Sequence, residues 1–339
     1  MKKKRLFSVL MMTLMVTTLL FGCSKPEDNG ETKEKVVLNE VAHSIFYAPM
    51  YVAIEEGYFE DAGIEIELVT GFGADKTMTA VLSGEADIGF MGPESTIYTY
   101  LGETSDTVVN FAQLTQRAGN FMVARQDEPN FKWEDLKGKT VLGGRKGGMP
   151  EMVFEYILLK NGIDPMNDLT IDQSIDFGST AAAFSGGKGD YTVEFEPGAT
   201  SLEEMDKGYH VVASLGVDSG YVPYTCFCAK ESYLKSNEET VQKFTNALQL
   251  GMNYVNSHSA EEIAQVIQPQ FKETDLEKLT TIVNRYHEQD TWKTDLVFEE
   301  ESFELLQNIL MSADQITERV PYEKLITTDF AKEALQEVK

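Results

Sequence analysis

The sequence predicts an α/β protein of two lobes, in which each lobe is a mostly parallel sheet flanked by helices. Runs rich in β-formers alternate with helix-like runs from Val36 onward, and the same alternation starts again near Lys139. Strands that alternate with helices form parallel sheets with helices on both faces. A chain of 339 residues is also longer than most single cores, so two lobes are expected.

The N-terminus has the pattern of an export signal. A basic stretch, residues 2–5, precedes an apolar run, residues 6–21, which is shorter than the roughly 20 residues of a spanning helix. The run ends in "LFGC", which resembles the lipobox of bacterial lipoproteins, where lipid is attached to the cysteine that follows the cleavage site. We therefore expect residues 1–22 to be a lipoprotein signal peptide, Cys23 to carry lipid and residues 23–34 to be a flexible tether. A plain signal peptide and an uncleaved anchor are the alternatives.

The first lobe is expected to begin with a βαβαβα unit. Its strands are predicted at residues 36–42, 64–69 and 86–90, and its helices at residues 48–57, 74–83 and 93–101. Pro93 suits the first turn of the last helix, because the N–H that proline lacks would have no partner there.

The second lobe is expected to repeat this unit. Its strands are predicted at residues 139–143, 169–175 and 191–195, and its helices at residues 150–160, 179–185 and 202–207. Two segments rich in β-formers, residues 108–125 and 209–229, are predicted to carry the chain between the lobes as hinge strands. Lobe 1 then comprises residues 35–116 and 222–339, and lobe 2 comprises residues 117–221.

The C-terminal third of the chain is expected to be a helical tail. Apolar residues follow amphipathic spacing in four stretches, at residues 241–255, 263–267, 276–286 and 303–311. This periodicity is typical of helices that pack one face on a core. We expect the tail to pack on lobe 1.

Charge and motifs exclude several classes of function. The chain has 29 basic and 55 acidic residues, a formal charge of −26, so it is a poor partner for nucleic acid, whose binding depends on clustered Lys and Arg. Its four histidines lack metal-ligand spacing, and the nucleophile elbow and the nucleotide-binding glycine patterns are missing. We expect no catalytic residue, metal or cofactor.

Turns from strand to helix supply the candidates for binding a small ligand. Ligands of open α/β sheets bind outside the carboxyl ends of the strands, where backbone N–H groups at helix starts are unpaired. "GGRKGGMPE" is such a turn, with glycines that leave room for close approach of a ligand. The candidates at these turns are Gly73, Asp75, Gly92, Glu94, Arg145, Gly148, Met149 and Thr180.

The chain also resembles a known family over most of its length. "SIFYAPMYVAIEEGYFEDAGIEIELVTGFGADKTMTAVLSGEADIGFMGPESTIY", "LKGKTVLGGRKGGMPE" and "GDYTVEFEPGA" are similar to segments of ABC-transporter substrate-binding proteins of the SsuA/THI5-like (NMT1) group. The resemblance implies the type II periplasmic-binding-protein fold, capture of a ligand by hinge closure, and a permease and an ATPase as partners. It implies a place on the outer face of the cell membrane, and a sulfonate, taurine, nitrate or a thiamine pyrimidine precursor as ligand.

Acidic residues favour a neutral or cationic heteroaromatic ligand, such as an aminopyrimidine. Burial of an anion beside a carboxylate is unfavourable, and the chain places Glu194 and Glu196 near the expected site. The resemblance places "EFEP" where pyrimidine-precursor binders carry an aromatic-Glu-Pro segment whose Glu accepts from the exocyclic amine. Because the two glutamates alternate on a strand, at most one is expected to face the ligand, and we favour Glu196.

Several of these residues also have a structural alternative. Ser44, Phe46, Tyr47 and Tyr221 are the further ligand candidates, with Tyr224 as an alternative to Tyr221 for stacking on a ring. Phe46 and Tyr47 could instead staple the helix that follows them, and Glu94 could cap its own helix. Arg117 and Arg145 could receive an anion, neutralise the acids or bridge the lobes.

An enzyme is the rival from another class. "YTCFCAK", with Cys226 and Cys228, resembles the cysteine-rich segment of THI5-type pyrimidine synthases, which share this fold. That segment has a longer run of cysteines, and those enzymes act inside cells, whereas this chain has an export signal. We favour two buried thiols. A receptor that presents its ligand to a sensor protein would use the same lobes.

Overall fold

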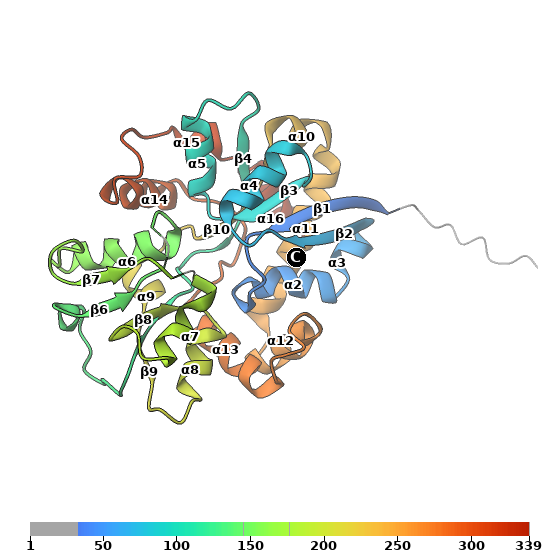
Figure 1. Cartoon of the computed structure of the whole chain (residues 1–339). Helices are drawn as coiled ribbons and strands as arrows, with labels where there is room; N and C mark the ends of the chain where they lie inside the picture. Colours follow the sequence, from blue (N-terminus) through green and yellow to red (C-terminus); the bar gives the residue numbers. More distant parts are fainter. Residues whose placement is uncertain (1–32, 145, 176, 339) are drawn as a thin grey trace, which may run out of the picture. The chain divides into compact units, whose positions relative to one another are not determined.

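Two mixed sheets of five strands form the frame of the protein (Figure 1). The first sheet has the order β2-β1-β3-β10-β4 and the second has the order β7-β6-β8-β5-β9. The strands of the first sheet are β1 (Glu34–Glu40), β2 (Ile64–Thr70), β3 (Ile88–Met91), β4 (Val108–Thr115) and β10 (Thr225–Lys230). Those of the second are β5 (Phe121–Ala124), β6 (Thr140–Leu142), β7 (Thr170–Asp172), β8 (Tyr191–Glu194) and β9 (His210–Ser214). The computed structural model describes residues 33–144, 146–175 and 177–338.

The two sheets follow the same plan. In each, one strand is antiparallel to both of its neighbours: β10 between β3 and β4, and β5 between β8 and β9. The other four strands of each sheet run in a common direction, since β1 pairs in parallel with β2 and β3, and β6 pairs in parallel with β7 and β8. Both antiparallel strands follow a crossing from the other sheet, so each sheet includes one strand delivered from its partner.

Helices follow the strands largely where the sequence predicts them. The longer ones in the two sheet units are α2 (Ala48–Glu55), α4 (Ala74–Ser83), α5 (Glu94–Leu101), α6 (Met149–Lys160), α7 (Thr180–Ser185) and α8 (Gly198–Glu203). Short turns of helix are η1 (Ile45–Tyr47), α3 (Tyr58–Asp61), η2 (Trp133–Leu136), η3 (Phe177–Ser179), α9 (Leu215–Ser219) and α10 (Glu231–Ser236).

One predicted helix is out of position, because α8 lies four residues before the stretch 202–207. The Glu196 carboxylate accepts from the Thr200 N–H at 2.9 Å and from the Thr200 hydroxyl at 3.0 Å. An acceptor at this position satisfies an N–H that would otherwise be unpaired in the first turn. The helix therefore begins close to the Glu-Pro pair.

The C-terminal helices cover the first sheet and also contact the second. They are α11 (Glu238–Ser257), α12 (Ala260–Ile267), η4 (Gln268–Gln270), α13 (Leu276–Glu288), α14 (Glu300–Ser312), α15 (Tyr322–Leu325) and α16 (Asp329–Glu337). Helix α11 packs along α2 and α16, whereas α14 contacts both α5 and α6. The expected packing on lobe 1 thus describes α11, but α14 also reaches the helices of the second sheet.

Aromatic side chains hold the antiparallel strand of the first sheet in its core. Phe227 on β10 stacks on Phe90 of β3, with ring centroids 4.2 Å apart, and its edge meets Phe244 of α11 at 5.5 Å. All three side chains are buried. Burial of each contributes roughly 1.5–3 kcal/mol relative to exposure, so β10 is anchored from one sheet neighbour and one helix.

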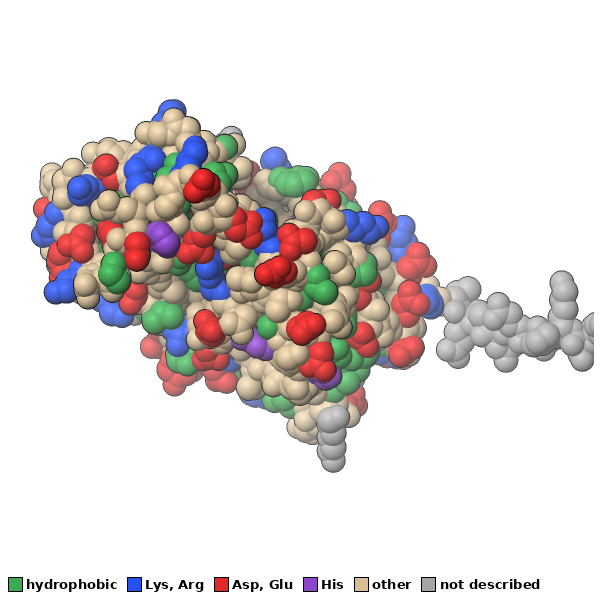
Figure 2. All heavy atoms as spheres, turned by 90° about the horizontal axis from the view of Figure 1, so that it is seen from below, with side chains coloured by type: hydrophobic (Ala, Val, Ile, Leu, Met, Phe, Trp, Pro, Cys, Tyr) green, Lys and Arg blue, Asp and Glu red, His purple; other side chains and the backbone are tan. Residues whose placement is uncertain are grey.

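Charged side chains cover the surface without a basic patch on the face seen in Figure 2. Asp and Glu are spread over this face, with Lys and Arg among them. Within the described residues, no helix combines the length and the apolar character needed to cross a membrane. The predicted signal peptide, the proposed lipid site Cys23 and most of the tether lie outside the described residues, as does Arg145.

Candidate functional site

Two short crossings connect the sheets and bring aromatic side chains from both together. Residues 116–120 lead from β4 to β5, and residues 215–224 lead from β9 to β10. The crossings are bonded to each other, because Asn120 Oδ1 accepts from the Tyr224 hydroxyl at 2.7 Å and the Asn120 carbonyl accepts from Leu215 N at 3.0 Å. A Cβ on Gly119 would lie 2.5 Å from Phe195 and 2.7 Å from Phe46. Glycine therefore lets rings from the two sheet units approach the crossing.

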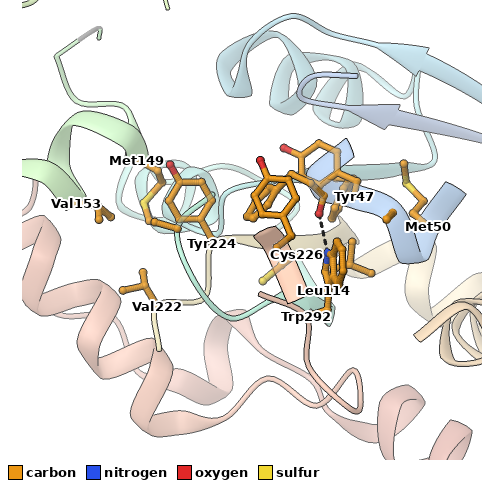
Figure 3. Close-up of a cluster of buried hydrophobic side chains, with 14 of the residues drawn as sticks. Tyr47, Met50, Leu114, Met149, Val153, Val222, Tyr224, Cys226 and Trp292 are labelled. Carbon is orange, nitrogen blue, oxygen red and sulfur yellow. Dashed lines mark hydrogen bonds between the residues drawn. The ribbon is translucent and has the colours of Figure 1, made fainter. Parts of the chain in front are cut away.

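Four aromatic rings meet at this point. Phe46 in η1 lies 5.7 Å from Phe195, which follows β8, and 5.6 Å from Tyr224, measured between ring centroids. Tyr286 of α13 completes the group at 5.3 Å from Phe46. Tyr47 extends it toward β3, with an edge contact to Phe90. Figure 3 shows Tyr47 and Tyr224 in the same buried cluster as Met149 of the second sheet unit.

Glu94 is a buried carboxylate at the start of α5, close to these rings. Its side chain is 5% exposed, and Oε2 has no hydrogen-bond partner among the described residues. Burial raises the pKa of Glu94 to about 7, partly offset by its own backbone N–H. Its charge raises the pKa values of Tyr47 and Tyr224. A Cβ on Gly92 would overlap the carboxylate, so the Gly-Pro-Glu turn fits this conformation.

Glu194 and Glu196 are both buried but have different partners. Glu194, at the end of β8, accepts from the Thr192 hydroxyl at 2.6 Å, and desolvation raises its pKa to about 7 although Thr192 and Thr180 lower it. Glu196 accepts from Arg285 Nη1 at 2.5 Å as well as from Thr200. Because protein donors already surround Glu196, we now favour Glu194 and Glu94 as the carboxylates that a ligand reaches.

Arg117 and Tyr221 lie together at the surface of the crossings. The Arg117 guanidinium carbon lies 4.2 Å from the centroid of the Tyr221 ring, and Nη1 donates to the Gly216 carbonyl at 3.0 Å. Tyr221 is half-exposed and its hydroxyl donates to Asp290 at 2.8 Å. The structure therefore places this pair with Asp290, and it is Tyr224 that joins the aromatic group.

The remaining candidates are placed at the edges of the two sheets. The Ser44 hydroxyl caps η1 by accepting from Phe46 N at 3.3 Å. Gly73 precedes α4, and Asp75 in its first turn is exposed. Gly148 is the residue before α6, Met149 begins that helix and is buried, and Thr180 is buried next to Glu194.

Comparison with known proteins assigns this arrangement to a family. A family model described as NMT1/THI5 like matches residues 45–262. A Bacillus subtilis (strain 168) protein, YtlA, whose name describes it as a binding protein, is 46% identical over 307 residues, which are 91% of this chain and 92% of that protein. The chain belongs to the NMT1/THI5-like family.

More distant likenesses of this family member agree with the predicted fold class. The alkanesulfonate-binding protein SsuA from Xanthomonas axonopodis pv. citri, bound to MOPS, matches with a TM-score of 0.68 at 14% identity, over 87% of this chain and 98% of that chain. The 4-amino-5-hydroxymethyl-2-methylpyrimidine phosphate synthase of Aspergillus parasiticus is 22% identical over 232 residues, 66% of each chain. The two-lobe fold and the family resemblance are confirmed.

Sequence reasoning missed three residues of this NMT1/THI5-like site. Asn120 is fully buried in the first crossing, and its Nδ2 has no partner among the described residues. Tyr286 and Arg285 come from α13, whose amphipathic pattern predicts packing but no contact with the ligand site. Only Asn120 gave a local signal, because a polar residue between two β-rich runs suits a crossing.

Cysteine and metal chemistry have little support in the described residues. Cys226 and Cys228 are free and buried on β10, and desolvation raises the pKa of both thiols. A buried thiol with a raised pKa is a poor nucleophile at neutral pH. The described residues contain no group of three or more His, Cys, Asp or Glu side chains arranged to hold a metal ion.

Proposed function

We propose that this chain is the extracytoplasmic solute-binding component of an ABC importer and that it captures a heteroaromatic amine between its two sheets. Membership of a family with a named binding protein supports the binding role. Permease and ATPase subunits would be its partners, and Cys23 would carry the lipid that holds it at the outer face of the membrane. The observation that carries the ligand class is the pair of buried carboxyls, Glu94 and Glu194, beside aromatic rings.

Burial of the site supports capture by hinge closure. Phe46 is fully buried, and Tyr47, Glu94 and Tyr224 are 4–5% exposed. A solute from bulk water reaches these side chains only if the sheets separate about the two crossings, residues 116–120 and 215–224. A ligand that contacts both sheets then favours the closed form by its differential affinity.

The charge of the site supports an amine over an anion. No lysine or arginine of the described chain contributes to the pKa of Glu94 or Glu194. A buried sulfonate would therefore face carboxyls without a compensating cation, which is strongly unfavourable. An amine donates to a carboxylate and favours its ionised form, because a hydrogen bond to the charged form lowers the pKa.

Calorimetric titration of the purified chain tests this ligand class. We expect heat of binding with 4-amino-5-hydroxymethyl-2-methylpyrimidine and none with taurine, an alkanesulfonate or nitrate at the same concentration. Binding of a sulfonate or nitrate in place of the pyrimidine would replace the proposed ligand by the anionic alternative. That outcome would leave the solute-binding role intact.

Lipid attachment is tested separately. We expect radiolabelled palmitate to be incorporated into the wild-type chain in a bacterial host and not into a Cys23→Ser variant. Equal labelling of both chains would exclude Cys23 as the lipid site.

A further inference from the structure

Two buried polar atoms of the ligand site lack partners, and they are of opposite kinds. Glu94 Oε2 is an acceptor and Asn120 Nδ2 is a donor, and neither has a hydrogen-bond partner among the described residues. Glu94 is 5% exposed and Asn120 is fully buried. An unpaired buried polar atom costs about 1–3 kcal/mol. A site that keeps one of each therefore gains most from a ligand that pairs with both.

Both atoms lie beside the same aromatic ring. Asn120 Oδ1 accepts from the Tyr224 hydroxyl at 2.7 Å, which directs the amide at the end of this ring. Glu94 lies close enough for its charge to raise the pKa of the Tyr224 hydroxyl. The two residues come from different parts of the frame, since Glu94 starts α5 after β3 and Asn120 lies between β4 and β5.

The local backbone holds both groups in place. A Cβ on Gly92 would overlap the Glu94 carboxylate, and Asn120 is held through its carbonyl by Leu215 N at 3.0 Å. Other buried carboxylates of the chain differ in this respect. Glu40, which is fully buried on β1, accepts from the hydroxyls of Tyr51 at 2.5 Å and Thr70 at 2.8 Å.

We infer that Glu94 and Asn120 determine ligand specificity by reading a donor–acceptor edge: Glu94 Oε2 accepts from an amine N–H, and Asn120 Nδ2 donates to a neighbouring ring nitrogen. This inference rests on the proposed function. A 4-aminopyrimidine has this edge, with its exocyclic amine next to an unprotonated ring nitrogen. A pyrimidin-4-one has the reversed edge, with a carbonyl acceptor next to a ring N–H, so it mismatches both groups.

The experiment compares these two probes on the full chain and its variants. The probes are 4-amino-5-hydroxymethyl-2-methylpyrimidine and the pyrimidin-4-one that has a carbonyl in place of its amine, titrated by calorimetry at pH 8. The wild type is expected to prefer the amine by about tenfold to a hundredfold, as for a site whose polar groups a mismatched ligand leaves unpaired. Glu94→Gln supplies an amide N–H, and Asn120→Asp replaces the donor with an acceptor while keeping the oxygen that Tyr224 contacts.

The readout is the ratio of the two affinities, because general damage to the site lowers both. Each variant is expected to lower the ratio at least about tenfold. Glu40→Gln, the control for a change in a fully partnered buried carboxylate, should leave the ratio within about twofold. Unchanged ratios in both variants, with a wild type that prefers the amine, would overturn this inference alone. A wild type that binds neither pyrimidine would overturn the proposed ligand class and this inference with it.

Discussion

At the scale of the residue, the buried carboxyl of Glu94 ties binding to pH. Its pKa is raised from 4.5 to about 7 by burial. The folded chain therefore holds a proton that the unfolded chain has released between these pH values. Stability falls with pH wherever the folded state binds more protons. We expect the free energy of unfolding of the ligand-free chain to decrease between pH 4.5 and 7 through this group.

Glu94→Gln removes that dependence, since an amide does not titrate. Between pH 5 and pH 8, the free energy of unfolding of the variant should rise relative to the wild type by about 1–3 kcal/mol. Urea unfolding at the two pH values measures this difference. Glu65→Gln, at an exposed position of β2, is the control and should show no such change. An equal pH dependence of wild type and Glu94→Gln would mean that Glu94 does not titrate in this range.

Glu196 has a different role in this account. Its carboxylate is held by Arg285 of α13 and by Thr200 of α8, and Arg285 also donates to Glu203 at 2.6 Å. Loss of one charge of a largely buried pair leaves the other partly unpaired. We predict that Glu196→Gln lowers the free energy of unfolding by about 2 kcal/mol, measured in urea at neutral pH.

A matched surface pair is the control for that variant. Glu204 accepts from Lys278 of the same helix α13 at 2.6 Å, and its side chain is half-exposed. Glu204→Gln should cost less than about 1 kcal/mol. Similar losses in the two variants would contradict a structural role specific to the buried pair with Arg285.

Residue-level prediction from sequence succeeded where the partner is local and failed where it is distant. Glu94 follows a Gly-Pro turn after a buried strand, a pattern that places an acid at the start of a helix near the ligand edge of a sheet. The preference for Glu196 over Glu194 relied on strand alternation, which carries no information about Arg285. That partner comes from a helix 89 residues further along the chain.

At the scale of the element, the Gly-Pro-Glu turn sets the position of the site carboxylate. Gly92→Ala would place a Cβ where the Glu94 carboxylate lies, so the carboxylate has to move. We predict at least about a tenfold loss of affinity for the aminopyrimidine probe, because a misplaced acceptor forfeits a charged hydrogen bond. Calorimetry measures this loss.

A second glycine offers the matched control for that substitution. Gly178 in η3 also follows a strand and precedes a helix, but a Cβ there meets nothing within 4 Å. Gly178→Ala should bind the probe as the wild type does. Full affinity in Gly92→Ala would show that the turn does not position the acceptor.

Most elements follow from local patterns, and the exceptions have a tertiary cause. Helix α4 has the predicted bounds, because its amphipathic residues and Gly84 define both ends. Helix α8 is shifted because the side chain of Glu196 satisfies Thr200 N, an interaction that periodicity does not report. The pairing of β10 between β3 and β4 could not be read from sequence, since it joins residues more than a hundred positions apart.

At the scale of the whole molecule, two crossings and the α13 contacts are the connections that closure has to preserve or break. The crossings are short and bonded to each other through Asn120. Contacts of Arg285 with Glu196 and Glu203 join a C-terminal helix to the second sheet unit. The position of the ligand between the two sheets is therefore the central claim, and it predicts a change in their separation.

The most direct test is the distance between labels on the two sheet units, measured by single-molecule energy transfer. Leu82 of α4 and Met166, beyond α6, are exposed, whereas Cys226 and Cys228 are buried. A Leu82→Cys, Met166→Cys chain with Cys23→Ser accepts dyes at these two positions. The account predicts that the 4-aminopyrimidine probe shortens the mean distance and narrows its distribution, and that taurine leaves both unchanged. An unchanged distance in the presence of saturating, calorimetrically verified aminopyrimidine would contradict capture between the sheets.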